Sequence, residues 1–207
     1  MAATDQMTVS IDDHVDGRTL RRTRNRTAVI DALLDIVGEG NLHPGAAEIA
    51  DRAGVSHRSI FRYFDDLDDL ARTAIAQGFA DAGPLAQIPQ IGVGPLDDRI
   101  ARYVENRLAL FARVDGTMQL ARMRAPTIPS IDEGLAEIAD VFRQQVAEHF
   151  SDELTTFDAE ARPLIVDAII VLTSYDAYTI HLRLLHSGHD RITDAWTTAL
   201  AAMLRQR

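Results

Sequence analysis

The sequence contains no cysteine and no lysine, and the absence of cysteine narrows the possible functions. Without cysteine the chain has no disulfide, no thiolate zinc site, no cysteine nucleophile and no thiol-based redox switch. Arginine supplies all 21 basic residues, a bias that a GC-rich genome would explain without any functional cause. No stretch approaches the roughly 20 uninterrupted apolar residues of a membrane helix, and the start lacks a signal-peptide pattern. We therefore expect a cytoplasmic protein with no membrane partner.

Enzyme signatures are missing as well. The chain has no phosphate-binding loop, no Gly-x-Ser-x-Gly elbow and no metalloprotease histidine pair. The aspartates at 65–69 are typical of a helix N-terminus, where carboxylates favour the helix dipole. His181, His186 and His189 lie close in sequence, but 181 and 186 point in different directions on a helix, so we expect packing or interface histidines. We predict no enzyme activity, no metal site and no cofactor.

The charge is negative overall but unevenly distributed. Acidic residues outnumber basic ones by 31 to 21, for a formal net charge of -10, whereas nucleic-acid binders usually carry a basic footprint. One short segment near the N-terminus, 18–26, has no acid at all and holds Arg18, Arg21, Arg22, Arg24 and Arg26. Such a run is most often a solvated helix face, and contact with DNA is the alternative.

Apolar residues recur at intervals of three and four along most of the chain, which indicates amphipathic helices. Residues 1–17 are polar and aperiodic, and we expect a disordered tail there. Proline and glycine are dense at 81–95, where helix is expected to stop. Ser130 and Glu133 form a capping-box pattern. Because no strand pattern occurs, the predicted fold class is all-α, with helices at 18–37, 96–114, 118–123, 130–150, 163–186 and 191–205.

Residues 44–79 carry the pattern of a helix, a tight turn and a second helix. Pro44 suits the first helical turn, and Gly54 can adopt the left-handed conformation that ends this helix. Ser56 follows as a candidate N-cap, and a third helix is expected to open at Asp65 or Asp66 and to continue towards Phe79. The residues expected to pack the first helix of this pattern are Ala47, Ile49, Ala50 and Ala53.

The second helix of this pattern, 56–63, has one apolar face. Ile60 and Phe64 lie four apart and are expected to be buried. The remaining positions should then face outward, where side chains can reach base edges or phosphates. The residues expected on this outer face are His57, Arg58, Ser59 and Arg62.

The segment AEIADRAGVSHRSIFRYF, residues 47–64, resembles the TetR family of bacterial transcriptional regulators. The positions that match the family pattern are Ile49, Ala50, Ala53, Gly54, Val55, Ser56, Ser59, Ile60, Phe61, Tyr63 and Phe64. The resemblance implies a three-helix DNA-binding domain at 18–79 and a helical effector-binding and dimerisation domain at 80–207. It also implies that 56–63 enters the major groove and that 163–186 and 191–205 pair with their copies in a homodimer. Beyond Phe79 only the arrangement of predicted helices supports the resemblance.

Arg58 is the best candidate for reading a base, because arginine can bond guanine bidentately for roughly 1 to 3 kcal/mol of discrimination. Tyr63 and the arginines of the first helix are expected to hold phosphates. Three positions depart from the family pattern: Phe61 replaces a usual tyrosine, Leu67 a frequent lysine, and Pro44–Gly45 a capping serine or threonine. The candidate DNA-binding residues are Arg22, Arg24, Ser56, His57, Arg58, Ser59, Arg62 and Tyr63.

A candidate ligand pocket rests on adaptable and aromatic side chains in the C-terminal half. The same side chains suit a plain hydrophobic core equally well. They are Phe111, Met118, Met123, Phe142, Tyr175 and Tyr178.

The leading hypothesis is a homodimeric repressor that a small-molecule effector releases from a palindromic double-stranded DNA operator. An effector-independent architectural DNA-binding protein is the first alternative, and a helical enzyme is the second. Neither the effector nor the operator can be named from the sequence.

Overall fold

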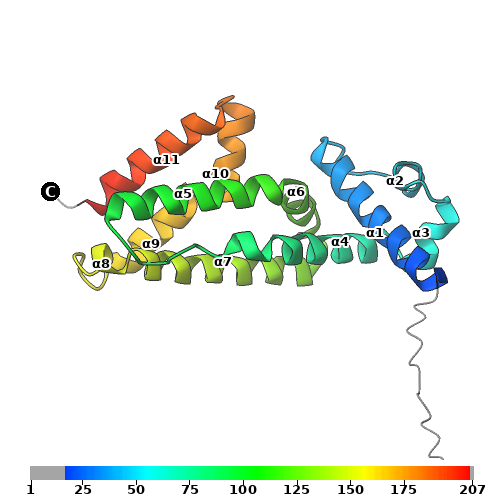
Figure 1. The fold of residues 1–207 in the computed structure, drawn as a ribbon, viewed down its shortest axis with the longest axis horizontal. Helices are drawn as coiled ribbons and strands as arrows, with labels where there is room; N and C mark the ends of the chain where they lie inside the picture. The colour runs from blue at the N-terminus through cyan, green and yellow to red at the C-terminus, as the bar shows by residue number, and fades with distance from the viewer. Residues whose placement is uncertain (1–16, 206–207) are drawn as a thin grey trace, which may run out of the picture.

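The structure, a computed structural model, describes residues 17–205, which form helices and no strand (Figure 1). The predicted all-α fold class is therefore confirmed. Of the predicted tail, residues 1–17, only Gly17 lies among the described residues, and it begins the first helix. In chain order the elements are α1 (Gly17–Gly38), α2 (Ala46–Ala53), α3 (His57–Tyr63), α4 (Leu67–Ala82), the 3-10 helix η1 (Gly83–Ala86), α5 (Leu96–Arg113), α6 (Asp115–Arg124), α7 (Pro129–His149), α8 (Ser151–Leu154), α9 (Ala161–Leu172), α10 (Tyr175–Thr179), the π-helix η2 (Ile180–Leu184) and α11 (His189–Leu204).

The turn between α2 and α3 has the geometry that the sequence predicts. Gly54 ends α2 with φ 67° and ψ 30°, a left-handed conformation that glycine adopts without strain. Its N–H donates to the carbonyl group of Ala50, and α3 then packs so that Ile60 is fully buried. Pro44 precedes α2 instead of entering its first turn, and Ala47 is exposed, so both of those expectations were wrong.

α4 connects the N-terminal helices to the rest of the molecule. Its first turn is capped by Asp66, whose carboxylate accepts a hydrogen bond from the Asp69 N–H at 2.6 Å. The helix then runs from beside α3 to the region between α5 and α7 (Figure 1). The division into domains at residue 79 stays a prediction, because α4 crosses that position without a break.

Buried apolar side chains gather in two clusters, and α6 contributes to both. The first cluster includes Val29, Leu33, Ile36, Ile49, Ile60, Phe64, Leu70, Ile75, Leu120, Ile128 and Ile131. The second includes Tyr103, Leu108, Phe111, Met118, Val146, Phe150, Ile169, Trp196 and Leu200. α6 supplies Leu120 to the first cluster and Met118 to the second, so it lies at the junction of the two halves.

Two glycines allow α6 to approach α1 and α4 closely. A Cβ atom added at Gly116 would lie 2.7 Å from the Leu34 carbonyl oxygen of α1, a distance that real Cβ atoms do not reach. A Cβ atom at Gly78 of α4 would overlap the Thr117 side chain of α6. The junction therefore depends on residues without side chains, because interiors packed at this density leave no room for a methyl group.

Two local predictions in the C-terminal half were wrong. The Ser130 and Glu133 capping box does not form, because α7 already begins at Pro129 and no side chain caps it. The single helix expected at 163–186 is broken after Leu172, and Ser174 caps a new helix by accepting a hydrogen bond from the Ala177 N–H at 3.1 Å. Periodicity could not reveal this break, since the apolar pattern continues on both sides of it.

A stripe of apolar side chains on α9 and η2 faces solvent. Val171 is 70% exposed and Leu184 is 75% exposed. Other members of the exposed stripe are Leu164, Ile180, Leu182 and Leu185. By length and composition Ala161–Leu184 could cross a membrane, but this is weak evidence, since core helices of water-soluble proteins pass the same test.

His149 anchors the loop before α5 to the end of α7. Its Nδ1 accepts a hydrogen bond from the Gly92 N–H at 3.1 Å, so Nε2 carries the proton and donates to the Arg99 carbonyl group at 2.9 Å. The Arg99 guanidinium in turn binds the His149 carbonyl group and the Glu153 carboxylate. Burial lowers the pKa of His149, and the charges of Arg102, Arg99 and Arg107 lower it further.

Because the folded state keeps His149 neutral, stability should depend on pH below the ordinary histidine pKa of 6.5. Above pH 6.5 His149 is neutral in both the folded and the unfolded state, so its contribution to the free energy of unfolding is complete. As the pH falls below 6.5 towards the lowered folded pKa, the unfolded chain binds a proton at this histidine and the folded state does not. The free energy of unfolding therefore declines. Urea unfolding should show this decline in the wild type and a smaller one in His149→Gln. Equal pH slopes in the two proteins would contradict the assignment.

Candidate functional site

α3 presents one polar face and one buried face. Ile60 and Phe64 pack inward, whereas His57, Arg58 and Arg62 are exposed, as predicted from the spacing. No carboxylate lies within ion-pair distance of the Arg58 guanidinium among residues 17–205, so this cation is available to an external anion. Phe61 is 49% exposed and packs edge-on against His57, with the ring centroids 5.3 Å apart.

Ser59 does not face outward, so that expectation was wrong. It is 9% exposed, and its hydroxyl lies 2.8 Å from the hydroxyl of Ser56. Ser56 stands at the N-cap position of α3, but its side chain caps no backbone N–H. The two serine hydroxyls thus share one hydrogen bond within the first turn of α3, and Arg62 Nη2 also donates to the Ser59 hydroxyl at 3.5 Å.

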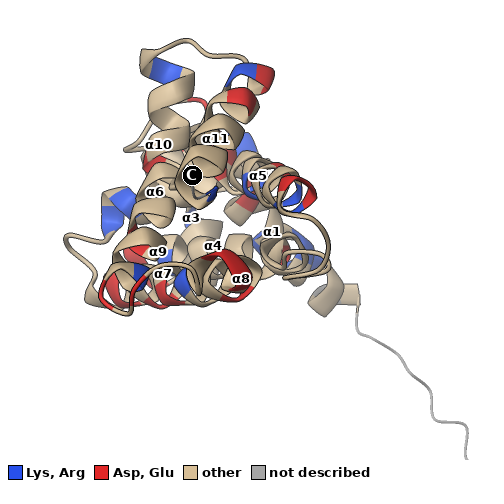
Figure 2. Ribbon diagram, turned by 90° about the vertical axis from the view of Figure 1, so that its left-hand side faces the viewer, with Lys and Arg blue, Asp and Glu red and all other residues tan. Residues whose placement is uncertain are grey.

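α1, the turn after α2, and α3 enclose a hollow of about 590 Å³. Three arginines line it and no carboxylate does, so the hollow is strongly positive. The acidic residues lie elsewhere: Figure 2 shows Asp and Glu along α7 and α8. The lining residues are Arg21, Arg22, Asn25, Gly54, Val55, Ser56, Ser59, Arg62 and Tyr63.

Tyr63 lies at the centre of the polar contacts in this hollow. Its hydroxyl accepts hydrogen bonds from Asn25 Nδ2 at 3.3 Å and from Arg62 Nη2 at 2.7 Å, and the Arg62 guanidinium carbon is 4.9 Å from the Tyr63 ring centroid. The hydrogen bond from Asn25, together with the hydrogen bond and charge of Arg62, lowers the pKa of the Tyr63 hydroxyl. These contacts hold α3 against α1 and fix the Arg62 side chain over the ring.

The arginines of α1 differ in position. Arg22 lines the hollow, Arg24 is exposed outside it, and the Arg26 guanidinium carbon lies 5.0 Å from the centroid of the Phe64 ring. Sequence reasoning did not single out Arg21 or Asn25 as site residues, although their four-residue spacing places them on one side of α1. The four-residue spacing of Arg21 and Asn25, next to the predicted site residue Arg22, is the sequence signal that could have identified both as site residues.

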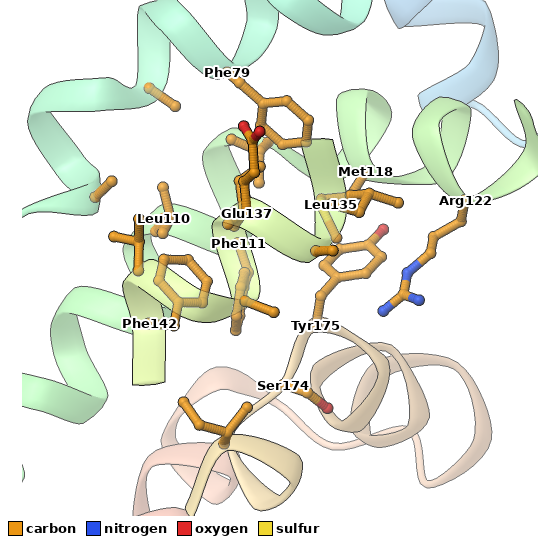
Figure 3. Close-up of a pocket in the computed structure, with 18 of the residues that line it drawn as sticks. Phe79, Leu110, Phe111, Met118, Arg122, Leu135, Glu137, Phe142, Ser174 and Tyr175 are labelled. Carbon is orange, nitrogen blue, oxygen red and sulfur yellow. The ribbon is translucent and has the colours of Figure 1, made fainter. Parts of the chain in front are cut away.

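A second concavity, of about 960 Å³, lies within the C-terminal half between α4, α5, α6, α7, α9 and α10 (Figure 3). Four residues predicted for a ligand pocket line it: Phe111, Met118, Phe142 and Tyr175. Met123 does not, because it packs against the first hydrophobic cluster. Tyr178 lies behind the lining, with its ring centroid 5.9 Å from that of Phe111.

Tyr175 connects this cavity to the junction between the halves. Its hydroxyl donates to the Asp115 carboxylate at 2.5 Å, and burial together with that bond raises the pKa of Tyr175 well above its usual range. Asp115 is the first residue of α6 and precedes Gly116, which lies against the Leu34 carbonyl group of α1. Tyr175 is therefore connected to α1 through Asp115 and the neighbouring Gly116.

Comparisons with known proteins agree with this architecture. Residues 29–74 match the family model described as bacterial regulatory proteins, tetR family. The HTH-type transcriptional repressor LfrR of Mycolicibacterium smegmatis is 32% identical over 130 residues, which cover 61% of this chain and 64% of that protein. The match thus spans a little less than two thirds of the repressor's length.

Solved structures share the fold at low identity. A transcriptional regulator from Rhodococcus sp. Rha1 is 17% identical with a TM-score of 0.69, covering 86% of this chain and 95% of the other. The multidrug binding protein EbrR complexed with ethidium is 20% identical with a TM-score of 0.55, covering 86% and 97%. The N-terminal helices thus match the model of the tetR family of bacterial regulatory proteins, and the arrangement of all the helices is shared with these solved structures.

Proposed function

We propose that this chain is a cytoplasmic, homodimeric transcriptional repressor that binds a palindromic DNA operator and leaves it when a small molecule occupies the C-terminal cavity. The observation that carries the proposal is the arginine-lined hollow beside the exposed face of α3. A hollow lined by three arginines and no carboxylate, in a chain of net negative charge, offers a surface suited to phosphates.

In this proposal α3 enters the major groove. Arg58 reads a base, while Arg22, Arg62 and Tyr63 position the helix by holding phosphates. His57 is a further candidate at the groove, and Ser56 and Ser59 support the turn. Arg24 would contact the neighbouring backbone, because it is exposed outside the hollow.

The exposed apolar stripe on α9 and η2 supports a dimer. Large contiguous apolar patches are uncommon on monomers and usually mark an interface. We infer that 163–186, with 191–205 beside it, pairs with the same segment of a second chain around a twofold axis. Two copies of α3 would then be held at a fixed distance, as a palindromic operator requires.

Val171→Asp should break this dimer. Val171 is 70% exposed in the single chain, so the change should barely affect folding, yet in a dimer it buries an unpaired carboxylate at a cost of several kcal/mol per subunit. Sedimentation or light scattering should show a monomer. The matched control is Val93→Asp, which places the same charge on an exposed valine in the loop before α5 and should remain dimeric. A monomeric wild type at all concentrations would refute the interface.

The cavity supports regulation by an effector. Its volume of about 960 Å³ suits a small organic molecule, and its lining mixes aromatic rings with a few polar groups. EbrR, which shares the fold, is described as a multidrug binding protein in complex with ethidium. An effector can act only by binding the DNA-competent and the released conformations with different affinity.

Genome-wide recovery of DNA bound to the protein tests the proposal. We expect enrichment of a palindromic site upstream of the protein's own gene or a neighbouring gene, followed in gel shifts by affinity that falls steeply with salt. Recovery of no sequence above background, or binding that salt leaves unchanged, would refute a role as a DNA-binding repressor. Specific binding that no metabolite extract releases would favour the architectural alternative.

A further inference from the structure

We propose that the effector is an organic acid, with a carboxylate held by Arg107 and an apolar body lying among the aromatic side chains of the cavity. This inference rests on the proposed function, because it names the chemistry of the molecule that occupies the effector cavity.

Arg107 is a buried cation on the cavity wall. It is 1% exposed, and its guanidinium carbon lies 4.0 Å from the centroid of the Phe142 ring and 5.0 Å from that of Tyr103. Its Nη2 donates to Gln145 Oε1 at 2.7 Å, and its Nη1 donates to Asn106 Oδ1 at 3.3 Å. Within the described residues no carboxylate lies within 4 Å of it. Amide oxygens and ring faces therefore stabilise this charge, and no protein anion neutralises it.

The surroundings do not supply a counter-charge either. Arg102, five residues earlier on α5, donates to Gln90 Oε1 at 2.8 Å and to the Val93 carbonyl group at 2.6 Å, both uncharged. Arg99 has a carboxylate partner, but Glu153 is fully engaged with it. Arg107 is therefore a buried guanidinium without a carboxylate partner among the described residues. Because buried charges normally have ionic partners, this guanidinium indicates an anion that the ligand brings.

The carboxylates of the cavity lie at its exposed margin. Asp132 and Glu137 both come from α7 and both are exposed, so neither offers a buried partner to a cation. Arg122, across the cavity from Phe142 in Figure 3, already donates to Asp176 at 2.6 Å. A cationic ligand that entered fully would meet Arg107, whereas an acid would find there a preformed donor with planar geometry.

Matched probes of one chain length test the charge preference. Decanoate, 1-decanol and decyltrimethylammonium carry the same apolar body with a negative, neutral or positive head. Binding is read from the fluorescence of Trp196, the only tryptophan, whose ring centroid lies 6.5 Å from that of Phe111 on the cavity wall. We expect decanoate to bind about tenfold to a hundredfold more tightly than 1-decanol, and decyltrimethylammonium more weakly than both.

Variants separate the carboxylate site from general hydrophobic uptake. Arg107→Gln should bind decanoate and 1-decanol equally, whereas Arg122→Gln, which removes an exposed arginine of the same cavity, should keep the preference. Arg107→Met retains the apolar stem and should also lose the preference if the Gln variant does not fold. Tighter binding of the ammonium probe by the wild type, equal binding of all three, or a preference that survives loss of Arg107 would overturn the proposal.

Operator binding is measured separately, with labelled DNA from the genome-wide experiment. A protein that binds its operator but prefers the ammonium probe would refute only the organic-acid inference. A protein that prefers decanoate but binds no DNA would refute the proposed function and leave the ligand chemistry standing.

Discussion

Replacing Arg58 by alanine is expected to lower operator affinity by about a hundredfold or more. A bidentate arginine-guanine contact contributes roughly 1 to 3 kcal/mol, and a homodimer on a palindrome loses it twice. Arg58 makes no ion pair among the described residues, so its removal should leave the fold unchanged. Fluorescence anisotropy with labelled operator DNA, repeated with each base of the half-site substituted, measures the loss.

The pattern of that loss distinguishes reading a base from holding a phosphate. If Arg58 reads a base, Arg58→Ala should relax discrimination at one position of each half-site and barely change the salt slope. Arg143→Ala is the control, because it removes an exposed cation from α7, far from α3 in Figure 1, and should bind the operator as the wild type does. Wild-type affinity and specificity in Arg58→Ala would contradict the assigned role.

Gly116→Ala is expected to destabilise the protein by about 1 to 3 kcal/mol and to weaken operator binding at the same time. The added methyl group would lie 2.7 Å from the Leu34 carbonyl oxygen, which belongs to the α1 backbone and cannot rotate away. α6 must then move from α1, and the arginine hollow, which α1 partly lines, changes with it. Thermal unfolding and operator affinity measure the two effects.

Gly134→Ala provides the matched control within α7. Nothing lies within 4 Å of a Cβ atom at Gly134, so alanine should stabilise this helix by about 0.5 to 1 kcal/mol through its higher helix propensity. Operator affinity should stay unchanged in this variant. A Gly116→Ala protein that is as stable as Gly134→Ala would show that the α1–α6 junction is looser than the structure indicates.

Local sequence determined the N-terminal half well. The left-handed Gly54, the buried Ile60 and Phe64, and the exposed Arg58 follow from constraints that act within a few residues, namely backbone sterics and helical periodicity. The orientation of Ser59 could not be predicted in this way. The spacing of Ile60 and Phe64 places Ser59 on the outer face, whereas in the structure Ser59 is buried and its hydroxyl pairs with that of Ser56 in the first turn of α3.

The C-terminal cavity was only partly predictable. Aromatic and methionine side chains suggested a pocket, but the same residue types fill ordinary cores, and Met123 indeed packs into one. Nothing in the sequence indicated that Arg107 would be a buried guanidinium without a carboxylate partner. That property arises because α5 and α7 bring Gln145 and Phe142 to it from far along the chain.

The sequence by itself determined that the chain is helical, that α3 exposes an arginine, and that Ile60 and Phe64 are buried on the opposite face. These properties depend on spacing of three and four residues and on the conformational freedom of one glycine. Only the tertiary structure decided which arginines share a hollow, where the cavity lies, and how Tyr175 reaches α1 through Asp115 and Gly116. The reason is physical: periodicity specifies which face of a helix is buried, whereas the partner on that face depends on how distant helices pack.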